Sequence, residues 1–238
     1  MTGRSHGVLV TSAVAAVLAA GAAPAIAAPD PADFGTRIDN PYWPMAPGSR
    51  WVYRETEGGV RQRVVVTVTR RTRVVDGVTT RVVHDRVTEG RRLVEDTYDW
   101  YAQHRDGTVW YFGEATQEYE DGRLVSSKGS WEAGVDGARA GRVMPAHPRV
   151  GMRYRQEHAP GEAEDAARIL SLDEQAEVPF GHFEPALMTK DFTPLEPRIL
   201  EYKLYAKGVG PVLVLAASGG AGREELVRFR RGGVAPAP

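Results

Sequence analysis

The stretch Arg61–Thr88, RQRVVVTVTRRTRVVDGVTTRVVHDRVT, indicates the fold class of this chain. Val64, Val66 and Val68 recur at every second position, which is the period of a β-strand with one buried face. The stretch is rich in β-branched residues, and these fit a pleated surface. Asp76-Gly77 interrupts the pattern, and this dipeptide accepts the positive φ angles of a tight hairpin turn. The stretch therefore predicts two antiparallel strands joined by a turn.

The same pattern extends along the chain, because Asp-Gly recurs at Asp106, Asp121 and Asp136. Turns at this spacing predict strands of about six to ten residues in up-and-down order. We expect strands at residues 50–56, 61–73, 78–88, 92–103, 108–113, 117–126, 152–158, 165–178, 182–191, 198–206, 211–217 and 223–230. The predicted fold class is all-β and mainly antiparallel.

The second half of the chain resembles the first. The run 98–102, YDWYA, matches 202–206, YKLYA, at an offset of 202 − 98 = 104 residues, and five further matches occur in the same order at offsets of 102 to 104. These matches predict two tandem β-meander repeats that form one curved sheet, either a half-barrel or a closed barrel. The alternative is that unrelated meanders share their turn spacing.

Residues 163–177 carry two conflicting signals for secondary structure. Ala, Glu, Arg and Leu are frequent in it, and these residues favour a helix. The repeat aligns the segment with the valine-rich strand at 61–73. We therefore expect a strand, because tertiary context overrides local propensity.

Residues 1–27 have the features of a secretory signal peptide. Arg4 precedes an apolar, alanine-rich run, and Ala25-Ile26-Ala27 has the small-x-small pattern of a cleavage site. An uncleaved membrane anchor is the alternative. We expect a secreted protein, or one on the exterior of the cell envelope, with no stable membrane span after cleavage. Its single β domain would cover 28–230, with repeat units 38–126 and 148–230, a surface-loop linker at 127–147 and a flexible tail at 231–238.

Composition excludes several classes of protein. The 238 residues contain 30 Lys and Arg against 31 Asp and Glu, and this balance argues against a nucleic-acid partner. With 42% hydrophobic residues, the chain has enough apolar material for a folded core. The chain has no cysteine, so it forms no disulfide and no thiolate metal site.

Residues 95–101, EDTYDWY, form the expected strand that is richest in polar and aromatic side chains. Alternation places Asp99 and Tyr101 on one face with Glu95 and Thr97. These side chains either line a concave pocket or form a solvated outer face. The candidate ligand-binding residues, taken from this strand, its counterpart in the second unit and a nearby aromatic cluster, are Asp99, Trp100, Tyr101, Trp110, Glu201, Lys203 and Tyr205.

Catalytic and metal motifs give no comparable signal. The histidines have no metal-ligand spacing, and no Gly-x-Ser-x-Gly motif is present. The acidic loop at 157–165 could hold a cation such as Ca²⁺, although an ordinary acidic hairpin explains it too. We expect no catalytic residue, no metal and no cofactor.

Several motifs resemble a group of uncharacterised secreted bacterial proteins. These motifs include Asn40-Pro-Tyr-Trp-Pro44, Gly48-Ser-Arg-Trp51-Val-Tyr53 and Pro194-Leu-Glu-Pro197. The resemblance implies no catalytic residue. A weaker likeness, to LolA/LppX-like half-barrel lipid carriers, implies a sheet that cradles a lipid, although this chain lacks their lipid-anchoring cysteine.

We expect a non-enzymatic exported protein that binds a small apolar or amphipathic ligand on its concave face. A secreted hydrolase that uses carboxylates, with or without a cation, is one alternative. A surface interaction module is another.

Overall fold

The computed structural model describes residues 30–219 and 222–233. The predicted signal peptide and residues 234–238 of the predicted tail lie outside this range. The elements are η1 (Pro31–Asp33), β1 (Phe34–Gly35), β2 (Arg50–Glu57), β3 (Val60–Val75), β4 (Val78–Glu89), β5 (Arg92–His104), β6 (Val109–Glu120), β7 (Arg123–Ser126), β8 (Trp131–Glu132), β9 (Gly141–Met144), β10 (Arg153–Arg155), β11 (Ala166–Val178), β12 (Gly181–Phe192), β13 (Leu200–Ala206), β14 (Gly210–Ser218) and β15 (Arg223–Arg230).

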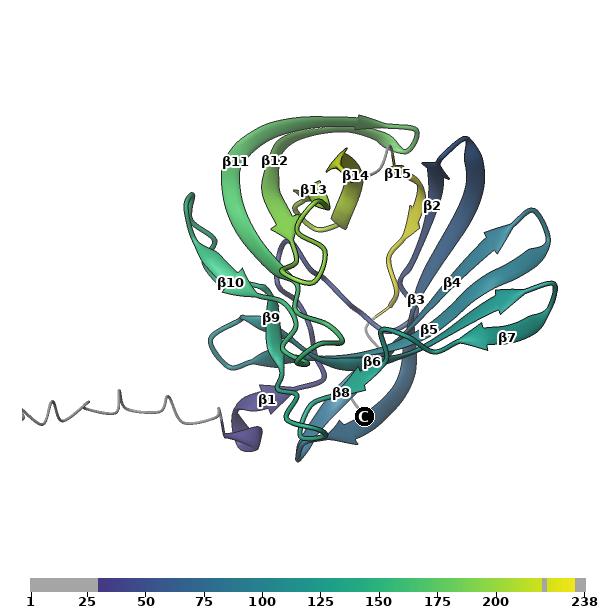
Figure 1. The fold of residues 1–238 in the computed structure, drawn as a ribbon. Helices are drawn as coiled ribbons and strands as arrows, with labels where there is room; N and C mark the ends of the chain where they lie inside the picture. Colours follow the sequence, from purple (N-terminus) through teal and green to yellow (C-terminus); the bar gives the residue numbers. More distant parts are fainter. Residues whose placement is uncertain (1–29, 220–221, 234–238) are drawn as a thin grey trace, which may run out of the picture.

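All the strands belong to one antiparallel sheet, which confirms the predicted all-β fold class (Figure 1). Its main path runs β10-β11-β12-β13-β14-β15-β2-β3-β4-β5-β6-β7. The path therefore contains two six-stranded meanders, joined where β15 pairs with β2. Tyr98 lies on β5 and Tyr202 on β13, each the fourth strand of its meander. The path ends at β10 and β7, so the sheet is curved but not a closed barrel.

Tight turns set the strand boundaries. Asp76 and Gly77 join β3 to β4 with φ angles of 48° and 76°, as a hairpin turn of two left-handed residues requires. Asp121 and Gly122 do the same between β6 and β7, with φ angles of 49° and 75°. The predicted interruption between 113 and 117 was wrong, because β6 continues to Glu120. β10 is also shorter than the predicted strand at 152–158.

The segment with the helical composition forms β11, a strand, as the alignment of the repeat predicted. Ala167 and Ile169 are fully buried, and Ala176 and Val178 are buried at the other end of the strand. β11 pairs with β12 along its whole length and with β10 at residues 166–168. Burial and sheet pairing thus override the helical preference of its Glu, Ala and Arg residues.

The linker between the meanders is not the surface loop that was predicted. It contains β8 and β9, and both pair with β6. Its Trp131 and Met144 side chains are buried in the core. An isolated bridge joins Arg139 to His158, just beyond β10. The linker therefore spans the gap between the two ends of the sheet.

Residues of both meanders and of the linker form one continuous hydrophobic core. The chain after β15 is held to the loop before β2, because the Gly232 amide donates to Ser49 Oγ at 2.9 Å. The core includes side chains from both faces of the sheet, among them Tyr101 and Trp100, which are neighbours on β5.

Candidate functional site

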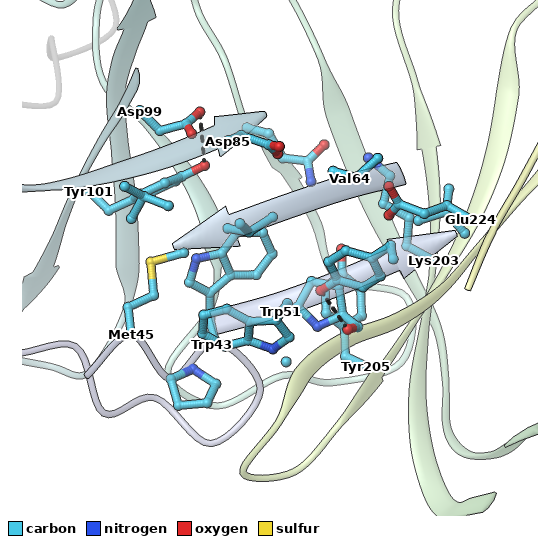
Figure 2. A pocket seen from close by; sticks show the side chains of 18 residues that line it. Trp43, Met45, Trp51, Val64, Asp85, Asp99, Tyr101, Lys203, Tyr205 and Glu224 are labelled. Carbon is cyan, nitrogen blue, oxygen red and sulfur yellow. Dashed lines mark hydrogen bonds between the residues drawn. The ribbon is translucent and has the colours of Figure 1, made fainter. Parts of the chain in front are cut away.

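A cavity of about 280 Å³ lies on the inner face of the sheet (Figure 2). Residues of both meanders and of the loop before β2 line it. The lining residues are Trp43, Pro44, Met45, Trp51, Tyr53, Val64, Val66, Val83, Asp85, Asp99, Tyr101, Gln156, Lys203, Tyr205, Gly210, Pro211, Val214 and Glu224. The cavity is thus apolar over much of its wall, with a few charged groups.

Strand register brings these side chains together. Paired residues on neighbouring strands share a face, and so do residues two apart on one strand. Val66 pairs with both Trp51 and Asp85, which places these three side chains in one row across β2, β3 and β4. A second row runs across the other wall, where Val214 pairs with both Lys203 and Glu224.

The loop before β2 closes one side of the cavity with apolar side chains. Asn40 anchors this loop, because its Nδ2 atom donates to the carbonyls of Gly107 at 3.0 Å and Pro145 at 3.1 Å. The ring of Trp43 lies between Tyr101 and Tyr205, with centroid distances of 6.0 Å and 5.9 Å. The buried Nε1 atom of Trp43 has no hydrogen-bond partner among the described residues.

Two carboxyl groups lie across the cavity from the apolar side chains of this loop, which form its floor. Figure 2 shows Asp85 and Asp99 together on one side of the cavity. Asp99 Oδ1 accepts hydrogen bonds from the hydroxyls of Tyr111 at 2.7 Å and Tyr101 at 3.5 Å. The buried Oδ1 atom of Asp85 has no hydrogen-bond partner within the described part of the chain.

Burial raises the pKa values of these carboxyls. It raises the pKa of Asp99 to about 6, although the hydrogen bonds from the tyrosines oppose the shift. It raises the pKa of Asp85 well above its ordinary value, and the negative charge of Asp99 adds to this effect. Glu114, the cross-strand partner of Asp99, has its pKa raised to about 9 by burial and by the same charge.

A lysine and a glutamate occupy the opposite wall. Lys203 Nζ lies 3.2 Å from Asp191 Oδ2 and 3.5 Å from Glu201 Oε2. Burial lowers the pKa of Lys203, but the negative charges around it, that of Asp191 foremost, together outweigh burial and raise the pKa well above its ordinary value. The charged form of Glu224, in contrast, is disfavoured: burial and the nearby Glu55 raise its pKa to about 8.

The structure brings together part of the predicted site. Asp99, Tyr101, Lys203 and Tyr205 all line the cavity. Glu201 lies beside it through its contact with Lys203.

Trp100 and Trp110 do not line the cavity, because they lie on the other face of the sheet. Trp100 is between Asp99 and Tyr101 on β5, so alternation turns it outward, where Arg73 stacks on it at 4.2 Å. Trp110 pairs with Ala102 and therefore shares the outer face, where it packs against Phe34. Their inclusion in one binding surface with Asp99 was wrong.

Four important lining residues were not predicted from the sequence: Asp85, Glu224, Trp43 and Met45. The sequence could have indicated Asp85, because it alternates with Val83 and Val87 on one face of the strand and is the one charged residue among these three. Glu224 shares its row with Val214 on β14, and the pairing of β15 with β2, which joins residues far apart in the sequence, connects this row to the first meander. No local periodicity marks Trp43 and Met45, which lie in a loop.

Metal chemistry finds no support in the part of the chain that the structure describes. No group of three or more His, Asp or Glu side chains within these ranges could hold a metal ion. The same residues contain no helix with the length and apolar character needed to cross a membrane.

Comparisons with known proteins give little further information. No protein-family model and no curated protein matches the chain. A crystal structure from Parabacteroides distasonis, described as that of a "putative lipoprotein", aligns with a TM-score of 0.45 and 10% identity over 79% of this chain and 98% of that one. A likeness at this level carries no argument about function. The all-β fold agrees with the resemblance to secreted β-rich proteins, while membership of that group stays a prediction.

Proposed function

We propose that this chain is an exported, non-enzymatic protein that binds a small amphipathic molecule in the cavity on the inner face of its sheet. The observation that carries the proposal is the cavity itself, which combines an apolar floor with a few charged groups at fixed positions. Small-molecule sites usually have this composition and range from about 300 to 1,000 Å³. A volume of about 280 Å³ therefore suits a small ligand better than a phospholipid.

The proposed binding residues come from both halves of the chain. Asp99 and Tyr101 belong to the first meander, whereas Lys203 and Tyr205 belong to the second. The strand order supports the proposal that the halves are tandem repeats, because each contributes its fourth strand to the cavity. Neither half alone would enclose the site.

The hydrolase alternative has one observation in its favour. A carboxyl group whose pKa is raised toward neutrality can act as a general acid, and Asp99 has such a pKa at about 6. However, no hydrogen bond joins Asp99 to a second carboxyl group among the described residues. The side chains that donate to Asp99 are the hydroxyls of Tyr111 and Tyr101, and these hold the carboxylate in place.

Native mass spectrometry of the protein, purified from its own secretion medium, tests the proposal. We expect a fraction of the protein to retain a non-covalent small molecule that gentle activation removes. Trp43→Leu should lose this adduct because it removes the floor of the cavity, whereas Trp110→Phe, on the outer face, should keep it. A bare protein mass in both the wild type and the Trp110→Phe variant would contradict binding, and turnover of the retained molecule would favour the hydrolase.

A further inference from the structure

The charges around the cavity restrict the chemistry of its ligand. The carboxyl groups of Asp85, Asp99 and Glu224 line it beside one basic group, the ammonium of Lys203. This ammonium already contacts Asp191, whose side chain is only 4% exposed, and Glu201. Lys203 is therefore neutralised by its own partners. Among the described residues, no ion pair joins Asp85, Asp99 or Glu224 to a basic side chain.

Asp85 supplies an observation independent of this charge count. Its Oδ1 atom is buried against the cavity without a hydrogen-bond partner in the described ranges. A buried carboxyl oxygen without a partner is costly, and native structures rarely retain one. A donor from a bound molecule would satisfy it.

The register places Asp85 and Asp99 at a suitable separation for one shared donor group. Val83 pairs with Asp99 and Asp85 pairs with Thr97, so the two carboxyls are diagonal neighbours on one face of β4 and β5. Diagonal neighbours in an antiparallel pair lie about 7–8 Å apart at the backbone. An ammonium or guanidinium group that donates to both carboxyls fits within such a gap.

The apolar floor of the cavity would contact the uncharged part of the ligand. Trp43, Met45 and Trp51 lie across the cavity from the two aspartates in Figure 2. Their side chains offer contact area to an aromatic or aliphatic body, and the Trp43 ring also attracts a cation.

From these observations we propose that the ligand is an organic cation, a primary amine or guanidinium on an apolar body, with its charged group between Asp85 and Asp99. This proposal rests on the proposed function and names the chemical class of its ligand. An anion would face three carboxyls with the single lysine occupied. A bare metal ion lacks a set of three ligands among the described residues.

Three probes of one shape test the charge of the ligand: 2-phenylethylammonium, neutral 2-phenylethanol and anionic phenylacetate. Binding to the full mature chain is measured by isothermal titration calorimetry at pH 7.5. We expect the amine to bind at least about tenfold more tightly than the alcohol, the ratio that about 1.4 kcal/mol of charge-assisted hydrogen bonding gives. Phenylacetate should bind most weakly of the three.

Variants test whether Asp85 and Asp99 cause the preference for the amine over the alcohol. Asp85→Asn and Asp99→Asn should each reduce the ratio of amine to alcohol affinity, and the double variant should bring it close to one. Asp96→Asn is the matched control, because Asp96 lies on the same strand as Asp99 and contacts His84 on the outer face. Circular dichroism verifies that each variant is folded. The wild-type probe series needs no variant, so it tests the proposal even if one fails to fold.

The outcomes separate this proposal from the proposed function. Equal or tighter binding of phenylethanol or phenylacetate to the wild type overturns the cationic class and leaves the binding function standing. An unchanged ratio in the double variant overturns the assigned position of the charge. If none of the probes binds at millimolar concentration and native mass spectrometry shows only bare protein, both proposals fail.

Discussion

At the scale of single residues, burial opposes the negative charge of the carboxyl groups that line the cavity and of Glu114, the cross-strand partner of Asp99. Asp85, Asp99, Glu114 and Glu224 all have raised pKa values, and burial is the largest cause for each. A buried carboxyl tends to take up a proton rather than keep an uncompensated charge. A bound cation would favour the charged form of the carboxyls beside it and so lower their pKa values.

Glu114→Gln tests this effect of burial. The folded pKa of Glu114, about 9, exceeds its ordinary value of 4.5, so folding at pH 7.5 requires proton uptake. The wild type therefore loses stability as pH rises from about 4 to about 9, and a neutral amide avoids this loss. We expect Glu114→Gln to raise the melting temperature at pH 7.5 by about 2–4 °C, which corresponds to about 1 kcal/mol. Thr116, which donates to Glu114 at 3.0 Å, can donate to glutamine as well.

Differential scanning calorimetry at several pH values measures the effect. The stabilisation should vanish near pH 4, where the carboxyl is protonated in both folded and unfolded states. Glu120→Gln is the control, because Glu120 is exposed on the same strand, and it should change the melting temperature little. A destabilised Glu114→Gln at pH 7.5, or an effect independent of pH, would contradict the raised pKa.

Residue-level patterns predicted some of the site. Alternation along β5 put Asp99 and Tyr101 on a common face, and the same rule, applied strictly, excludes Trp100. Trp100 and Trp110 entered the predicted site as aromatic residues close in sequence, without regard to their face. Trp43 could not be placed, because a loop residue has no periodicity that fixes its direction.

At the scale of elements, the sequence predicted most strands because Asp-Gly turns and valine alternation are local signals. β11 followed from the alignment of the two halves rather than from its own residues. β8 and β9 were missed, because they are short and their pairing with β6 depends on non-local contacts. These two strands belong to the linker that spans the ends of the sheet.

Gly141→Ala tests how much that linker contributes. Gly141 begins β9, and a Cβ atom there would overlap the carbonyl oxygen of Gln156, which is backbone and cannot move aside. We expect the free energy of unfolding to fall by about 1–3 kcal/mol, the usual cost of overpacking. Gly35→Ala is the matched control, because a Cβ at Gly35 meets nothing within 4 Å.

Urea denaturation gives the free energy of unfolding for both variants. Gly35→Ala should unfold at the same urea concentration as the wild type. If Gly141→Ala also matched the wild type, the linker would not be packed tightly against the end of the second meander.

At the scale of the whole molecule, two meanders and a linker surround one cavity. The chain positions its charges by register between strands that are distant in sequence, as Glu224 illustrates. The sequence could therefore predict a concave binding face, but not which carboxyls meet there. The outer face carries Trp100 and Trp110, each covered by an arginine.

The chain's five tryptophans give a direct readout of where a ligand binds, because each indole N–H yields one NMR signal. The cavity is lined by Trp43 and Trp51, whereas Trp100 and Trp110 lie on the outer face. Titration of ¹⁵N-labelled mature protein with 2-phenylethylammonium should shift the Trp43 and Trp51 indole signals and leave those of Trp100 and Trp110 unchanged. Shifts confined to Trp100 and Trp110, or no shift at any indole at saturating probe, would contradict binding in the cavity.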